Sequence, residues 1–353
     1  KAANFLFCLL LFSLPSKMLW LFVLLLSPYS LCLDIQVIDH SKTHSCSGWE
    51  LRASHPWSPR EGLMGVSHQG SLYMSAGRGF YGVGFSNEVW KTANGTLWKK
   101  VDQKSFPKRA YHNMVSLGEC MYVFGGQTFT RFYNDVWRSC DQGYTWEEIQ
   151  PQAPWKARAG AGAIVLNDTI YVAGGCYNNE DRKRSFLNDV WRSRDGVAWE
   201  KVTDSAEWSP RSGARLVALR QQLFIVAGEI GFTPETQLGD VWVSDNNGQH
   251  WSLATDKPGF SPRSGHGVVE ANGALLLVGG WPKLYDVWKS KDGVTWEKVC
   301  ESAWNCHKKQ CGRFDFWPVV HNHELATFGG AYSYSTFGKL WSESWGIPLK
   351  NIE

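Results

Sequence analysis

The 353-residue sequence predicts an all-β fold, a six-bladed β-propeller of four-stranded blades that is closed by a strand from near its beginning. Three observations indicate this fold. A phrase typified by Asn134-Asp135-Val136-Trp137 recurs about every 50 residues. Between the copies lie short runs of β-branched and aromatic residues bounded by Gly, Asn or Asp. Residues 49–52 have the character of a strand that the last copy lacks.

The N-terminal residues 1–32 are expected to be a secretory signal, with the true start of the protein at Met18. The apolar run at 19–26 would form its hydrophobic region, and residues 30–32 a cleavage site. A membrane anchor is the alternative, although Lys17 interrupts the continuous span of about 20 apolar residues that an anchor needs. The other expected boundaries are a linker at 33–47, the propeller at 48–345 and a C-terminal tail at 346–353.

Two glycosylation sequons, Asn94-Gly95-Thr96 and Asn167-Asp168-Thr169, agree with a secreted, extracellular glycoprotein without a membrane span after signal removal. Of the nine cysteines, Cys8 and Cys32 belong to the expected signal. In an oxidising compartment the remaining seven are expected to form disulfides, which leaves one thiol free or paired between chains.

The second copy of the repeat shows the four expected strands of one blade, named a to d in chain order. Strand a covers 112–116, strand b 121–124, strand c 135–138, and strand d begins at Trp146. The glycine pair that closes strand b permits a positive φ where neighbouring blades crowd together. Because one such sheet cannot cover its own faces, several must stack around an axis.

Closure of the ring is predicted from the two ends of the chain. The last copy of the phrase, at 338–341, is not followed by a good strand d, whereas residues 48–52 match that strand. We therefore expect these residues to complete the sixth blade and remove its open edge.

The glycine pairs and the tryptophan spacing, from Trp49 to Trp345, resemble a kelch-repeat β-propeller. A second pattern, Ser139-x-Asp141-x-Gly143-x-x-Trp146, is similar to the Asp box of sialidase-type propellers. An Asp or Asn beside Gly suits a tight hairpin, in which its side chain caps main-chain amides.

The predicted strand pairing also places the cysteines. Cys120 begins strand b and Cys140 ends strand c of one blade, so the two are expected to form a disulfide. A metal cluster around Cys306-His307 is possible by residue type, but secretion favours disulfides there. To lock the ring, Cys46 is expected to pair with one of Cys300, Cys306 and Cys311.

One arginine stands at the entry to strand a of every blade, on the face that carries the d–a and b–c connections, which we call the upper face. A ring of six guanidinium groups around the channel mouth would suit a carboxylate, sulfate or phosphate. The resemblance supports this hypothesis, because kelch domains that capture acidic peptides use arginines at this position. The alternative is a structural role, with each arginine pairing with the Asp of the Asp-Val-Trp phrase. The six are Arg60, Arg109, Arg158, Arg211, Arg263 and Arg313.

Aromatic residues of the b–c connections are expected beside the arginines on the upper face, where they would contact a sugar ring, an aromatic molecule or a peptide. The candidates for ligand binding are Tyr81, Tyr133, Trp281 and Tyr332.

Three residues near the channel mouth, which forms a funnel on the upper face, are candidates for catalysis. His112 and His266 follow an arginine by three residues and would act as a general base if they face the channel. The alternative is an inner-strand histidine with a purely structural role. Glu229 replaces the second glycine of its blade on the upper rim.

Two classes of function follow. The net charge of +3 gives no case for nucleic acid binding, and no cofactor or metal site is expected. The first class is a secreted module that binds an anionic small molecule, a glycan or an acidic peptide. The second is an enzyme that uses the same funnel, such as an isomerase, a glycosidase or an oxidase, including one that oxidises a luciferin-like substrate. If the arginines bind ligand, replacing Arg211 and Arg263 by alanine should weaken binding and leave thermal stability nearly unchanged.

Overall fold

The computed structural model describes residues 48–54, 56–79, 84–101, 104–305, 312–332 and 343–352. The predicted signal, the linker at 33–47, Tyr81, Cys46, Cys306 and Cys311 lie outside these residues. No helix in the described ranges is long and apolar enough to cross a membrane.

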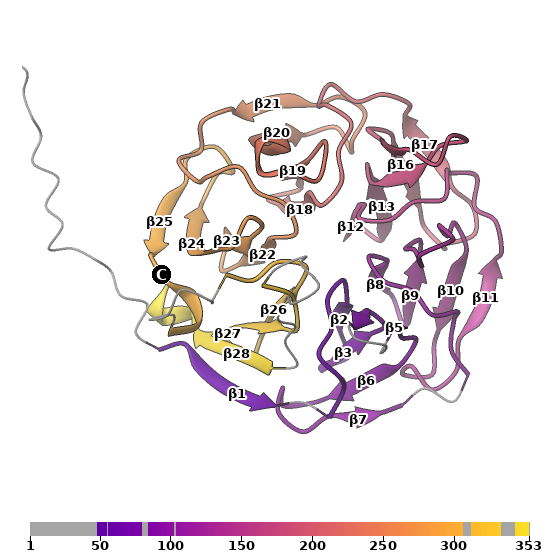
Figure 1. The fold of residues 1–353 in the computed structure, drawn as a ribbon, viewed down its shortest axis with the longest axis horizontal. Coiled ribbons are helices and arrows are strands. Elements are labelled where there is room, and N and C mark those ends of the chain that lie inside the picture. Colours follow the sequence, from indigo (N-terminus) through magenta and orange to yellow (C-terminus); the bar gives the residue numbers. More distant parts are fainter. Residues whose placement is uncertain are drawn as a thin grey trace, which may run out of the picture. The chain divides into compact units, whose positions relative to one another are not determined.

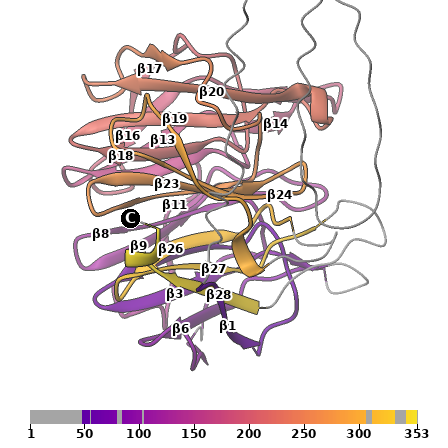
Figure 2. The same ribbon diagram turned by 90° about the vertical axis from the view of Figure 1, so that its left-hand side faces the viewer.

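Six antiparallel four-stranded sheets form a closed ring of blades, as predicted (Figure 1). Figure 2 shows the ring from the side, with the strands running across the page. Blades 1 to 3 consist of β2 (Met64–His68), β3 (Ser71–Ser75), β6 (Val89–Thr92) and β7 (Lys99–Lys100); β8 (Asn113–Leu117), β9 (Cys120–Phe124), β10 (Val136–Ser139) and β11 (Glu147–Gln150); and β12 (Gly162–Leu166), β13 (Thr169–Ala173), β16 (Val190–Ser193) and β17 (Glu200–Thr203).

The other three blades follow the same order from the axis outward. They consist of β18 (Arg215–Leu219), β19 (Gln222–Glu229), β20 (Gln237–Ser244) and β21 (Ser252–Thr255); β22 (Gly267–Ala271), β23 (Ala274–Gly280), β24 (Leu284–Ser290) and β25 (Glu297–Cys300); and β26 (Trp317–His321), β27 (Glu324–Phe328), β28 (Glu343–Pro348) and β1 (Glu50–Ser54). Short additional elements are β4 (Arg78–Gly79) paired with β5 (Gly84–Phe85), β14 (Cys176–Asn178) paired with β15 (Arg184–Phe186), and the 3₁₀ turns η1 (Pro234–Thr236), η2 (Ala303–Asn305) and η3 (Leu349–Asn351).

The N-terminal strand closes the ring. Strand β1 pairs antiparallel with β28 and is the outermost strand of the sixth blade, as Figure 1 shows at the perimeter. This confirms the strand predicted at residues 48–52. The prediction that residues 338–341 form the last copy of the Asp-Val-Trp phrase was wrong. Residues 343–345, at the start of β28, occupy the equivalent position in the sixth blade. The propeller also continues past residue 345, since Leu349 and Ile352 are buried in its core.

A second closure lies at the axis, where six main-chain hydrogen bonds form an unbroken ring. In each blade the residue two positions after the repeated arginine donates its N–H to the corresponding carbonyl of a neighbouring blade, at 2.7 to 3.1 Å. All six residues have φ between 53° and 63°, a region that favours glycine. They are Gly62, Tyr111, Gly160, Gly213, Gly265 and Asp315.

The core lies between adjacent blades, where the sheets stack face to face. In the cluster between blades 2 and 3, Phe124 of β9 packs with Ile170 and Val172 of β13, and Trp155 and Trp191 are buried in the same cluster. Equivalent clusters occur between the other blades. The repeated tryptophans therefore stabilise the interfaces between blades by removing large apolar surfaces from water.

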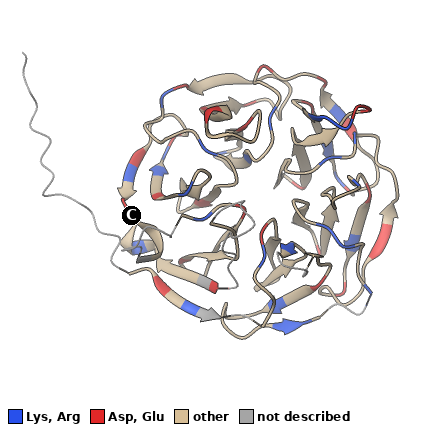
Figure 3. Ribbon diagram, in the orientation of Figure 1, with Lys and Arg blue, Asp and Glu red and all other residues tan. Residues whose placement is uncertain are grey.

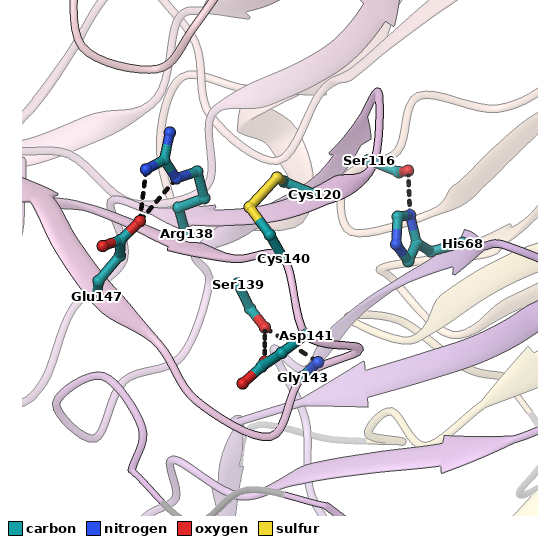
Figure 4. Close-up of a disulfide and its surroundings, with 9 residues drawn as sticks. All are labelled: His68, Ser116, Cys120, Arg138, Ser139, Cys140, Asp141, Gly143 and Glu147. Atoms are coloured by element: carbon teal, nitrogen blue, oxygen red, sulfur yellow. Dashed lines mark hydrogen bonds and ion pairs between the residues drawn. A yellow bond between two sulfur atoms is a disulfide. The ribbon is translucent and has the colours of Figure 1, made fainter.

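The c–d hairpins are capped by their own side chains, as Figure 4 shows for blade 2. The Ser139 hydroxyl donates to Asp141 at 2.8 Å and accepts from the N–H of Gly143 at 3.0 Å. The N–H of Thr145 donates to Asp141, and the indole N–H of Trp146 donates to the Gly143 carbonyl. The predicted capping of a tight hairpin is found, whereas the likeness to sialidase-type propellers remains a resemblance. Equivalent bonds occur at 193–199, 244–251 and 290–296.

The predicted disulfide between Cys120 and Cys140 is present and joins β9 to the end of β10 (Figure 4). Cys300 also forms a disulfide, whereas Cys176 is a free and buried thiol. The predicted pairing of Cys46 cannot be placed because Cys46 lies outside the described residues.

Removal of the first disulfide gives a testable prediction. The bond closes a loop with a sequence separation of 20, so the double variant Cys120→Ser, Cys140→Ser should lose about 3 kcal/mol of unfolding free energy. The loss is expected because the unfolded chain regains the freedom that the cross-link removes. Denaturant unfolding of both proteins would measure it, and an unchanged midpoint would contradict the prediction.

Candidate functional site

The six predicted arginines do not face the channel. Each is at most 3% exposed, and its guanidinium forms an ion pair with a strand c carboxylate of the same blade, at 2.6 to 3.2 Å. A terminal nitrogen also donates to the main-chain carbonyl 16 residues further along the chain, near the end of strand b. The expected ring of ligand-facing guanidinium groups is therefore corrected. The pairs are Arg60 with Glu88, Arg109 with Asp135, Arg158 with Asp189, Arg211 with Asp240, Arg263 with Asp286, and Arg313 with Glu343.

The repeated phrase has a structural explanation in these pairs, and the alternative interpretation of the arginines is confirmed. In blade 3, both oxygens of Asp189 accept from Arg158 at 2.7 Å, and the indole N–H of Trp191 donates to the same carboxylate. Burial raises the pKa of Asp189, but Arg158, the Trp191 indole and a main-chain hydrogen bond together lower it below its usual value. The Asp and Trp of the phrase thus hold strand c against the entry to strand a.

A cavity of about 350 Å³ opens at the upper face on the propeller axis. Its wall contains residues at the end of strand b or shortly after it in several blades, Arg78, Gln127, Cys176 and Glu229, together with Phe232 of a b–c connection. These positions belong to the upper face, on which the sequence placed the candidate residues. The lining residues of the cavity are mostly different from the predicted ones.

Two further arginines line this cavity, Arg184 of β15 and Arg215 of β18. Arg184 donates to the Gln127 side chain at 2.9 Å and contacts the Cys176 sulfur at 3.3 Å. Arg215 donates to the main-chain carbonyls of His266 and Phe316, so its side chain crosses from blade 4 toward blades 5 and 6. Within the described residues neither guanidinium forms an ion pair. Arg184 and Arg215 are therefore cations of the cavity whose direct hydrogen-bond acceptors are neutral groups.

Glu229, which the sequence placed on the upper rim, lines the cavity, and among the described residues its hydrogen-bond donors are all neutral. Its carboxylate accepts from Ser264 at 2.9 Å, from Ser212 at 3.2 Å and from Gln237 at 3.4 Å. Burial raises the pKa of Glu229, and these hydrogen bonds and the nearby Arg184 oppose the rise. Glu229 is thus a partly desolvated acid close to a cation, which is a common arrangement at functional sites.

A charged cluster in blade 1 was missed by the sequence reasoning. Arg78 forms an ion pair with the fully buried Glu61, and the hydroxyl of Tyr111 donates to the same carboxylate at 2.8 Å. Burial raises the pKa of Glu61 and also that of Tyr111. Comparison of the repeats could have identified Tyr111, because it stands at a position where four other copies have glycine. Tyr111 nevertheless keeps the left-handed φ of that position.

The two histidine candidates differ in position. His112 lines the cavity, and its Nε2 lies 2.9 Å from the Ser75 hydroxyl. Burial, with a smaller contribution from Arg109, lowers the pKa of His112 to about 3, so the ring is neutral at neutral pH. His266 is fully buried and is not a lining residue of the cavity, and burial lowers its pKa well below the usual value. His266, directly before the innermost strand β22, is therefore a buried residue outside the cavity lining, and the condition for its role as a general base in this cavity is not met.

The three predicted aromatic residues that the structure describes, Tyr133, Trp281 and Tyr332, are not among the residues that line the cavity. Tyr133 is buried, with its ring 4.2 Å from the guanidinium carbon of Arg109. Trp281 pairs with Ser264 through the main chain, and the Tyr332 ring lies 5.1 Å from the Lys283 ammonium.

Aromatic contacts at the cavity come from other side chains instead. Tyr111 and Phe232 line it, and the Phe232 and Phe132 rings lie 5.4 Å and 4.9 Å from the guanidinium carbon of Arg184.

Neither charged patches nor metal-binding groups give a further candidate for a functional site in the part of the chain that the structure describes. Among the described residues no cluster of His, Cys, Asp or Glu could hold a metal ion. Figure 3 shows basic and acidic residues interspersed around the ring. The axial cavity is consequently the strongest candidate for a functional site in this part of the chain.

The closed ring of four-stranded blades, with glycine pairs after strand b and an arginine at the entry to strand a, defines a kelch-type propeller. Comparison with known families agrees, because residues 62–280 match the KLHDC2/KLHL20/DRC7 Kelch-repeats domain. Since this match covers more than half of the chain, the protein belongs to the kelch-repeat family.

Three relatives illustrate how distant known members are. An F-box/kelch-repeat protein of Arabidopsis thaliana is 24% identical over 326 residues, which cover 83% of this chain and 65% of that protein. Spermatocyte protein spe-26 of Caenorhabditis elegans is 26% identical over 197 residues, 54% of this chain and 33% of that protein. The host cell factor homolog hcf-1 of the same organism is 25% identical over 217 residues, 54% of this chain and 27% of that protein. The chain thus spans less than two thirds of each relative.

Proposed function

We propose that this kelch-repeat propeller is a recognition module that binds a small anionic ligand, of the acidic-sugar type, in its axial cavity. The observation that carries the proposal is the pair of cavity-lining cations, Arg184 and Arg215, which form no ion pair within the described residues. Glu229 and Asp315 act on these guanidinium groups electrostatically without pairing with them directly. A ligand carboxylate would supply the direct, hydrogen-bonded contact that the two cations lack among the described residues.

The remaining lining suits a sugar bearing a carboxylate. Gln127 and Glu229 offer side-chain hydrogen-bond partners for hydroxyl groups, and the half-exposed Phe232 and the partly buried Tyr111 offer aromatic faces for the apolar side of a ring. The volume of about 350 Å³ lies at the small end of the range for small-molecule sites. An acidic peptide could place only one side chain in such a space.

We further propose that the protein meets this ligand outside the cell. The disulfide between Cys120 and Cys140 supports an oxidising compartment, because such bonds are rare in reducing cytosol. Both sequons stand in connections of the opposite, lower face, so glycans there would leave the cavity open.

An enzyme that acts on the same ligand is the second candidate, and Glu229 is the observation that favours it. Its buried carboxyl lines the cavity together with Arg184, so an anchored ligand would lie within reach of an acid or base with a raised pKa. His112 is the weaker partner because its ring stays neutral until strongly acidic pH.

A matched pair of sugars tests the proposal. Glucuronate should raise the melting temperature of the purified protein, whereas glucose, which lacks the carboxylate, should not, because only a ligand that binds the native state stabilises it. Isothermal titration calorimetry with both sugars would confirm the difference. Stabilisation by an acidic peptide but by no acidic sugar would contradict the ligand class, and conversion of the bound sugar, followed by NMR, would identify an enzyme.

A further inference from the structure

The lower face has a second hollow, of about 520 Å³, between blades 3 and 4. Asn167 and Thr169, the first and third residues of a sequon, line it. Its other lining residues include Tyr171, Arg192, Trp199 and Asn247. Hydroxyl, guanidinium and amide groups beside an indole are the groups with which proteins bind sugars, through hydrogen bonds and ring contacts.

We propose that Asn167 is an N-glycosylation site and that the first sugars of its glycan lie in this hollow, against Trp199 and Arg192. The inference requires synthesis through the secretory pathway but does not depend on the ligand of the axial cavity. Asn167 is exposed in the turn between β12 and β13, and its side chain has no hydrogen bond within the described residues. Its amide is therefore available for modification.

The modification is a complete transfer reaction. The side-chain nitrogen of Asn167 attacks the anomeric carbon of an oligosaccharide that is attached to a lipid diphosphate. The carbon–nitrogen bond forms as the carbon–oxygen bond to the diphosphate breaks, and the lipid diphosphate and the amide proton leave. The donor is a substrate of the host's secretory pathway.

The second sequon provides a matched comparison within the same chain. The Asn94 side-chain oxygen accepts from the main-chain N–H groups of Thr96 and Leu97 and from the Thr92 hydroxyl, so this side chain caps its hairpin. Asn94 does not line the lower hollow. A glycan on Asn94 would extend into solvent, whereas a glycan on Asn167 would have a surface to pack against.

The test uses two hosts and three proteins: the wild type, Asn167→Gln and Asn94→Gln. Each is secreted from a glycosylating eukaryotic host and is also made in a bacterial periplasm, where disulfides form but this glycan is not added. Intact mass should show that Asn167→Gln lacks one glycan. The loss in melting temperature caused by Asn167→Gln should be at least about 2 °C greater in the glycosylating host, because only there does it remove the packed sugars.

The bacterial proteins measure the effect of the substitution itself, so the difference between hosts belongs to the glycan. For Asn94→Gln the two hosts should give the same change. An unmodified Asn167 in the secreted protein would overturn the proposal. So would a modified Asn167 whose removal shifts the melting temperature equally in both hosts, because the glycan would then make no contact.

Discussion

Replacing Arg263 by alanine is expected to cost about 3–5 kcal/mol of unfolding free energy, because it leaves a buried carboxylate without its counter-ion. The guanidinium is fully buried, contacts both oxygens of Asp286, and donates to the carbonyls of Gly279 and Ser261. The substitution removes all of these contacts together. This reverses the expectation from the sequence that alanine at Arg211 and Arg263 would leave thermal stability nearly unchanged.

The control for this variant is Arg138→Ala, which removes an arginine from a partly exposed ion pair with Glu147. Such surface pairs contribute about 0–1 kcal/mol, so its unfolding midpoint should stay close to that of the wild type. A combined variant, Arg263→Met with Asp286→Leu, should be more stable than Arg263→Ala, because no charge is then left buried alone. Equal stability of Arg263→Ala and the wild type in denaturant unfolding would show that the ion pair is not structural.

The fold could be predicted from the sequence because the same residue pattern recurs in successive blades. Each copy of Asp-Val-Trp places the same pair of strands, and Trp49 identified the strand that closes the ring. The sixth copy was misplaced because Glu343-Ser344-Trp345 departs from the Asp-Val-Trp phrase, and the contact between Arg313 and Glu343 in the structure identifies it as the equivalent segment. A sequence pattern shows that such an arginine recurs, but the direction of its side chain depends on that distant carboxylate.

The site was harder to predict because it consists of exceptions to the repeat. Tyr111 and Asp315 occupy ring positions that hold glycine in the other four blades, and both line the cavity. Arg215 lies on an innermost strand at a position where no other blade has a charged residue. Comparing the copies position by position for departures, instead of agreements, would have identified all three. Arg184 could not be found in this way, since its connection has no counterpart of equal length.

Replacing Arg184 by methionine is expected to weaken binding of glucuronate by a factor of about 30 or more. Loss of one partner of a desolvated, hydrogen-bonded charge pair costs about 2–5 kcal/mol, and each 1.4 kcal/mol is tenfold in affinity. The protein should otherwise stay intact, because Arg184 is half-buried at the cavity and, within the described part of the chain, its hydrogen bonds join it to Gln127 and Cys176 alone. Titration calorimetry gives the dissociation constant, and a thermal melt without ligand checks the fold.

Arg182→Met is the matched control, because Arg182 belongs to the same connection, carries the same charge and is exposed. A charge that attracts the ligand only from a distance would be equally important at both positions, and added salt would screen its effect. Direct contact in the cavity instead predicts a large loss at Arg184 and less than a twofold change at Arg182. Similar losses in the two variants would place the ligand outside the cavity, and the argument from Arg184 and Arg215 would then fail even though the propeller is intact.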